Sequence, residues 1–90
     1  MNDDPNPLQR IARTPLIGEI AAARRWARRI TASDELELFL NSKDAEDIPE
    51  GWGLMNMPIR KSIGVPQGKA FIFDRRSCQY IRPGEQLRTS

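Results

Sequence analysis

The side chains that could carry chemistry are four acids near the middle of the chain, a glycine-containing segment and a single thiol. The acids are Asp44, Glu46, Asp47 and Glu50. Carboxylates can bind a metal ion, but this spacing matches no calcium loop and includes no glycine for the sharp turn that such loops need. We therefore expect surface acids.

The glycine-containing segment GVPQGK covers residues 64–69 and weakly resembles a phosphate-binding loop. Three residues separate its glycines where a phosphate loop has four, and Ala70 stands where the loop needs a hydroxyl. We expect a hairpin turn here. Cys78 is the only cysteine, so it cannot form an internal disulfide, and we expect it to pack in a strand as a small hydrophobic side chain.

The sequence contains no histidine, which excludes the Ser-His-Asp and Cys-His nucleophile systems and the usual zinc sites. Together with the weak candidates above, this predicts a protein that is not an enzyme and has no cofactor and no metal site.

Arginines and tryptophans are the stronger candidates, as interface residues. A helix over residues 15–30 would place four arginines on the side opposite its apolar stripe, where they form either a solvated face or a surface for phosphates or an acidic partner. Trp26 would flank the core, and exposed tryptophans often anchor interfaces. The candidate interface residues are Arg24, Arg25, Trp26, Arg28, Arg29, Trp52, Arg75 and Arg76.

Charge is distributed in blocks along the chain. The formal net charge is +2. Residues 15–31 carry four arginines and one acid, residues 32–52 carry seven acids and one lysine, and residues 53–90 carry seven bases and two acids. This pattern suits electrostatic docking.

The order of the helices and strands expected from the sequence predicts an α+β fold. In this fold one long helix packs on a small, mainly antiparallel sheet with a short second helix. Residues 1–14 are expected to form a flexible arm, and residues 15–90 a single domain, as the length of 90 residues allows. Thr14 is the expected N-cap and Pro15 the first helical residue. The stripe is Leu16, Ile20, Ala23, Ala27 and Ile30.

Residues 35–40 favour a strand, with a short helix capped by Ser33 as the alternative. Asn41-Ser42 predicts a turn and N-cap before a helix over 43–48. A strand with Met55, Met57 and Ile59 in alternation follows, where Pro58 implies an edge or a bulge.

The last third of the sequence predicts a turn over residues 65–68, with Pro66 at its second position and Gly68 at its fourth. A central strand over 69–74, a return strand over 78–82 and a type II turn over 82–85 follow. Phe71→Ala in the central strand is expected to cost about 3–5 kcal/mol.

The segment Met57–Asp74, MPIRKSIGVPQGKAFIFD, resembles part of the major capsid proteins of tailed phages. In that family a strand with a Pro-aliphatic pair and a Ser leads into a Val-Pro-x-Gly turn and a strand that ends in Asp. Upstream, the long helix and Asn41-Ser42-x-Asp44 resemble the family's spine helix and its Asn-Pro-x-Asp turn, with Ser42 where Pro is usual. The resemblance covers residues 15–82.

This resemblance implies the peripheral domain of the shell fold that capsid proteins share with encapsulins, because 90 residues leave no room for the axial domain and extended loop. It implies a phage-derived structural protein that contacts capsid protein or a second copy of itself, in virion assembly or as an accessory virion component.

The alternatives are a nucleic-acid-binding module that uses the helix arginines with a basic hairpin, and a host-directed inhibitor. No apolar segment predicts a leader or a membrane span, so we expect the host cytoplasm or the virion.

Overall fold

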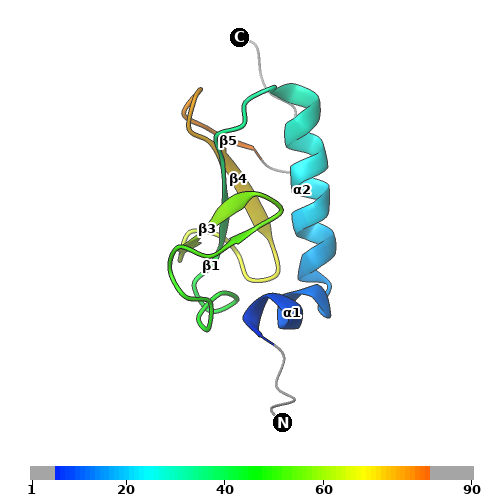
Figure 1. The fold of residues 1–90 in the computed structure, drawn as a ribbon, viewed down its shortest axis with the longest axis vertical. Coiled ribbons are helices and arrows are strands. Elements are labelled where there is room, and N and C mark those ends of the chain that lie inside the picture. Colours follow the sequence, from blue (N-terminus) through cyan, green and yellow to red (C-terminus); the bar gives the residue numbers. More distant parts are fainter. Residues whose placement is uncertain (1–5, 82–90) are drawn as a thin grey trace.

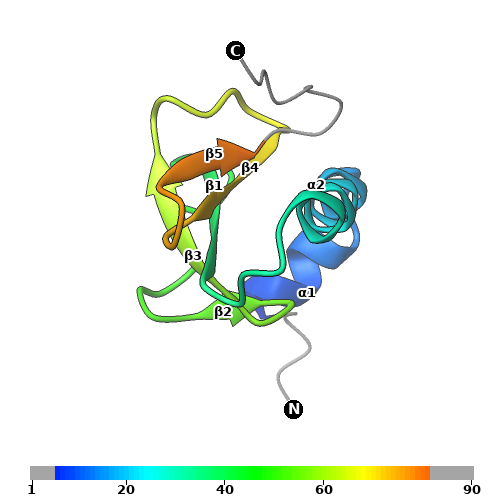
Figure 2. The same cartoon turned by 90° about the horizontal axis from the view of Figure 1, so that it is seen from above.

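The computed structural model describes residues 6–81, which form a five-stranded sheet with two helices on one side (Figures 1 and 2). The strand order is β2-β3-β1-β4-β5. The helices are α1 (Pro7–Ala12) and α2 (Leu16–Ile30), and the strands are β1 (Leu36–Asn41), β2 (Gly53–Leu54), β3 (Met57–Ser62), β4 (Ala70–Asp74) and β5 (Gln79–Ile81). The α+β class is confirmed. The pair β1–β3 is parallel, and the other three pairs are antiparallel.

The long helix α2 forms because its apolar residues recur at helical spacing. Leu16, Ile20, Ala23 and Ala27 are buried, and Ile30 is half-buried at the C-terminal end. The expected cap is wrong: the Thr14 hydroxyl donates to the carbonyl of Ile11, and Pro15 occupies the N-cap position without a side-chain bond.

The N-terminal residues differ from the expected arm, because residues 7–12 fold as α1. Asn6 and Gln9 form a capping box, in which each side chain accepts from the other residue's backbone N–H. Pro7 at the first helical position needs no N–H partner. Ile11 is fully buried, and this burial fixes the short helix against the core.

The strand prediction for residues 35–40 is confirmed by β1, and the alternative helix is wrong. The Ser33 hydroxyl accepts from the N–H of Glu35 in a tight turn before the strand. The helix expected over 43–48 is also wrong, because these residues form consecutive turns. The short second helix of the fold is therefore α1.

β2 and β3 form a hairpin whose two-residue turn is Met55-Asn56. Both residues have positive φ, at 53° and 64°, as a turn that matches the twist of the strands requires. Met55 is therefore in the turn and does not alternate with Met57 in one strand. Pro58 pairs with Gly53 in β2, and the parallel ladder to β1 begins only at the next residue. This position resembles an edge, because Pro58 has a paired neighbour on one side only.

Residues 63–69 connect β3 to β4, which lie on opposite sides of β1. The expected hairpin turn is therefore wrong, and the segment crosses over the end of the central strand. The turn within it is shifted by one residue: the N–H of Lys69 donates to the carbonyl of Pro66, which places Gly68 at the third turn position with φ of 79°.

β4 has a paired strand on each side, as expected for residues 69–74. Cys78 differs from its prediction: it lies in the β4–β5 turn with φ of 57°, and it is exposed. The return strand β5 covers residues 79–81. The type II turn expected over 82–85 lies outside the described residues.

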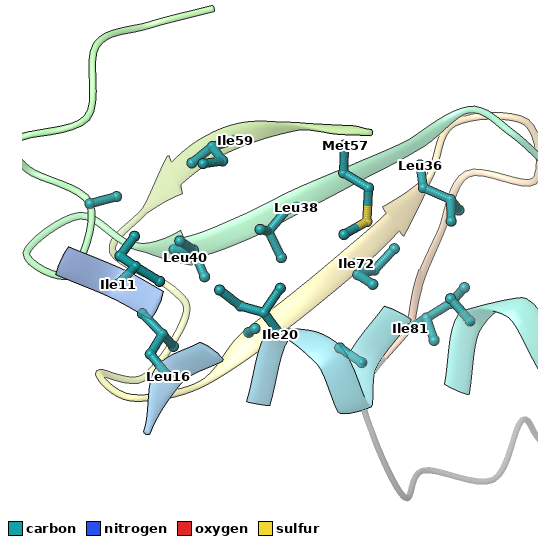
Figure 3. Close-up of a cluster of buried hydrophobic side chains, with 14 of the residues drawn as sticks. Ile11, Leu16, Ile20, Leu36, Leu38, Leu40, Met57, Ile59, Ile72 and Ile81 are labelled. Atoms are coloured by element: carbon teal, nitrogen blue, oxygen red, sulfur yellow. The ribbon is translucent and has the colours of Figure 1, made fainter. Parts of the chain in front are cut away.

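The core lies between the sheet and the helices (Figure 3). Leu36, Leu38 and Leu40 of β1 point toward the helices, and Ile20 of α2 lies among them. Alternation along β1 then places Glu37 and Phe39 on the opposite face of the sheet, which neither helix covers (Figures 1 and 2). We call this the open face.

Candidate interaction surface

Three aromatic rings from three neighbouring strands pack together on the open face. Phe39 comes from β1, Phe73 from β4 and Tyr80 from β5. Ring centroids are 6.1 Å apart for Phe39–Phe73, 5.3 Å for Phe39–Tyr80 and 4.9 Å for Phe73–Tyr80. Edge and tilted contacts of this kind are favourable beyond the area they bury. The rings therefore form a pre-arranged apolar surface, and Tyr80 remains half exposed.

A buried carboxylate holds two arginines beside these rings. Glu37 lies on β1 with only 8% of its surface exposed. Its Oε2 is 3.1 Å from a terminal nitrogen of Arg60 and 4.0 Å from Nε of Arg75. Both arginine side chains are more than half exposed. Glu37 thus pairs with two arginines that remain available to solvent or to a partner.

Two pockets of similar size are each lined in part by an aromatic ring of this face. One of about 290 Å³ is lined by Ser62, Gly64, Val65, Phe71 and Tyr80. The other, of about 280 Å³, is lined by Phe39, Ile48, Pro49, Glu50, Gly51, Ile59, Arg60 and Lys61. Ile63, which adjoins two residues of the first pocket, is 90% exposed.

The helix arginines differ from one another in environment. Arg24 is half-buried and donates through Nε to the carbonyl of Met55, so it ties α2 to the β2–β3 turn. Arg25, Arg28 and Arg29 are exposed. They form no ion pair with any residue from 6 to 81.

Trp26 packs against the core as a half-buried side chain. The guanidinium carbon of Arg29 lies 5.8 Å from the centre of its ring, within the range of a cation–π contact. Its Nε1 is buried and has no hydrogen-bond partner within the described part of the chain.

Two of the four acids near the middle of the chain, Asp44 and Asp47, make contacts inside the fold. Arg10 of α1 donates to both carboxylate oxygens of Asp47, at 2.9 and 2.6 Å, and to the carbonyl of Asp44. The Arg10 hydrogen bond lowers the pKa of Asp47. Asp44 accepts from the N–H of Gly68. These contacts fasten residues 43–48 to α1 and to the crossing segment, which explains why a regular helix does not form there.

The eight residues predicted as an interface are distributed over separate parts of the molecule. Arg75 contacts Glu37 on the open face, Trp52 lies in the loop before β2, and the helix arginines lie on α2, which packs on the other face. Arg76 lines a pocket together with residues 31–33, after the end of α2.

Sequence reasoning did not select Phe39, Phe73, Tyr80 or Ile63. Phe71 and Phe73 alternate with Ala70, Ile72 and Asp74 along β4, and this alternation was the available signal for an aromatic second face. No sequence signal identified Ile63, whose exposure follows from the crossing segment.

Comparisons with protein-family models, with curated proteins and with solved structures find no match. Among residues 6–81, no helix combines the length and the apolar character needed to cross a lipid bilayer.

Proposed function

We propose that this chain is a non-enzymatic structural protein that acts through protein–protein contacts. The observation that carries the proposal is the open face, which neither α1 nor α2 covers. A packed aromatic cluster, two arginines paired with Glu37 and a pocket without charged lining residues lie there. Exposed apolar surface of this kind, rimmed by polar groups, is typical of interaction sites.

The order of elements supports a relation to phage capsid proteins. A long helix is followed by a strand that ends at Asn41, a turn region that contains Asp44, and a strand with Pro58. A crossing segment then leads to a strand that ends at Asp74, and a return strand follows. We propose a role in virion assembly or as an accessory virion component, in the host cytoplasm or the virion, with capsid protein or a second copy as partner.

Sedimentation velocity tests this proposal, with the protein alone over a range of concentrations and with a tailed-phage major capsid protein during shell assembly. We expect concentration-dependent association, incorporation into shells, or both. The proposal would be contradicted if the protein sediments as a single monomer boundary at every concentration and is not incorporated into the shells.

A nucleic-acid-binding role is the second candidate, because Arg25, Arg28 and Arg29 are exposed and form no ion pair among the described residues. Binding to phosphates would weaken steeply with salt. Retention on DNA or RNA at low salt that is lost at moderate salt, and lost in a variant with these arginines changed to Gln, would favour it over the protein-contact role.

A further inference from the structure

Ile63 is an isolated apolar side chain at the start of the crossing segment. It is 90% exposed, the most of any large hydrophobic residue that the structure describes. Its position is defined by the turn, because the N–H of Gly64 donates to the Ser62 hydroxyl oxygen at 3.1 Å. An isoleucine so fully in solvent gains free energy when a partner buries it.

The residues on either side of Ile63 line a preformed pocket. Its volume is about 290 Å³, and it is lined by Ser62, Gly64, Val65, Phe71 and Tyr80. Val65 is buried, and its carbonyl accepts from the side-chain amide of Asn41 at 2.7 Å, which ties the crossing segment to β1. Tyr80 packs against the rings of Phe39 and Phe73. The walls are therefore held by contacts within the fold.

The pocket matches a branched aliphatic side chain in size and chemistry. An apolar cavity of about 150 Å³ binds benzene, so about 290 Å³ is enough for an isoleucine side chain. None of the five lining residues is charged, so two copies could approach here without like charges meeting at the centre.

We infer that two copies of this chain associate about a two-fold axis, with each Ile63 inserted into the pocket of the other copy beside Tyr80. A two-fold contact requires one surface that complements itself. Here the exposed residue directly adjoins the pocket along the chain, since Ser62 and Gly64, the neighbours of Ile63, both line the pocket. This inference rests on the proposed function and specifies its self-associating form.

Ile63→Ser tests the projecting side. The side chain makes almost no contact in the monomer, so the variant should fold, which circular dichroism checks. Each dimer loses two equivalent contacts, and at about tenfold per contact the association constant should fall about a hundredfold in sedimentation equilibrium.

Gly64→Val tests the receiving side. A Cβ at Gly64 would meet only the Ser62 hydroxyl, at 3.4 Å, so the backbone has room for a side chain that narrows the pocket, and circular dichroism checks that the variant folds. We expect a similar loss of association. A mixture of the two variants should associate more strongly than either variant alone, because the mixed dimer keeps one intact Ile63 opposite one intact pocket.

Gln67→Ser is the matched control, since Gln67 is another exposed residue of the crossing segment and does not line this pocket. It should leave the association constant unchanged. Two results would overturn the inference and leave the proposed function standing. One is a wild-type dimer whose association constant Ile63→Ser does not lower, and the other is a wild-type monomer that is incorporated into phage shells. A monomer that does not enter shells would contradict both.

Discussion

At the scale of single residues, Asp74 is a buried charge held without a cation. It is 2% exposed and forms no ion pair within residues 6–81. Its carboxylate accepts from the Arg76 N–H at 3.0 Å, the Ser77 hydroxyl at 3.0 Å and the Thr31 hydroxyl at 3.1 Å. Asp74 therefore joins the end of β4 to the segment between α2 and β1.

These hydrogen bonds determine the direction in which the pKa of Asp74 is shifted. Burial raises the pKa, but hydrogen bonds from Ser33, the Arg76 N–H, Ser77 and Thr31 favour the charged form more strongly, so the pKa is lowered from its ordinary value of 3.8. The unfolded chain therefore binds this proton more readily than the folded chain does. The stabilisation is fully present when the pH lies above the pKa of Asp74 in the unfolded chain. It is lost as the pH falls through the pKa of Asp74 in the folded chain.

Asp74→Asn should lower the free energy of unfolding at pH 7 by about 1–3 kcal/mol, because the charge-assisted bonds become weaker or unpaired. Urea unfolding measures this. Between about pH 5 and pH 2 the wild type should lose stability more steeply than the variant. Parallel pH profiles of the two proteins would contradict this account of Asp74.

At the scale of elements, β4 has two unlike faces. Ile72 points into the core and is fully buried, whereas Phe71 and Phe73 on the open face are half-buried. The large cost expected for Phe71→Ala is therefore better assigned to Ile72.

Ile72→Ala should cost about 2–5 kcal/mol, because it removes buried methyl groups and leaves a cavity. Ile63→Ala is the matched control: it makes the same chemical change at a residue that is 90% exposed, and should cost less than about 0.5 kcal/mol. Both are measured by urea unfolding at low protein concentration. Equal costs for the two variants would contradict the orientation of β4.

Elements with a local signal were predictable from the sequence. The apolar stripe of α2 and the alternation in β1 are both present in the structure, because local pattern and core agree there. For α1 the signal was available but was not used: Asn6-Pro7 followed by Gln9 is a capping box with proline at the first helical position.

Elements fixed by distant partners were not predictable. Residues 43–48 carry helix-start signals, but Asp47 contacts Arg10, and Asp44 contacts Gly68 at a separation of 24 residues. The parallel pairing of β1 with β3 likewise has no local signature, and because of it the hairpin turn expected over residues 64–69 is part of a crossing segment instead. The open-face cluster depends on this strand order, so sequence reasoning selected arginines and tryptophans instead.

At the scale of the whole molecule, the core is one-sided, because the described helices cover one face of the sheet and leave aromatic rings on the other (Figure 2). A chain of 90 residues buries a smaller share of its surface than a larger domain does. Association of two copies would add buried area on the face where the aromatic residues are only partly buried.

The melting temperature should therefore depend on protein concentration. If the folded chain dimerises and the unfolded chain does not, Tm should rise over a hundredfold increase in concentration. Calorimetry or circular dichroism measures this. Ile63→Ser should show a nearly constant Tm over the same range, and a wild-type Tm that does not change would contradict the dimer.

The central position of β1 also has a consequence for the order of folding. β1 is the first strand among the described residues, yet its neighbours β3 and β4 end at residues 62 and 74. A nascent chain therefore carries Leu38 and Leu40 with both edges of β1 unpaired until β3 has left the ribosome, and with one edge unpaired until β4 has left it. Chains that stop before Ala70 would leave one edge of β1 open to other chains, and are expected to aggregate.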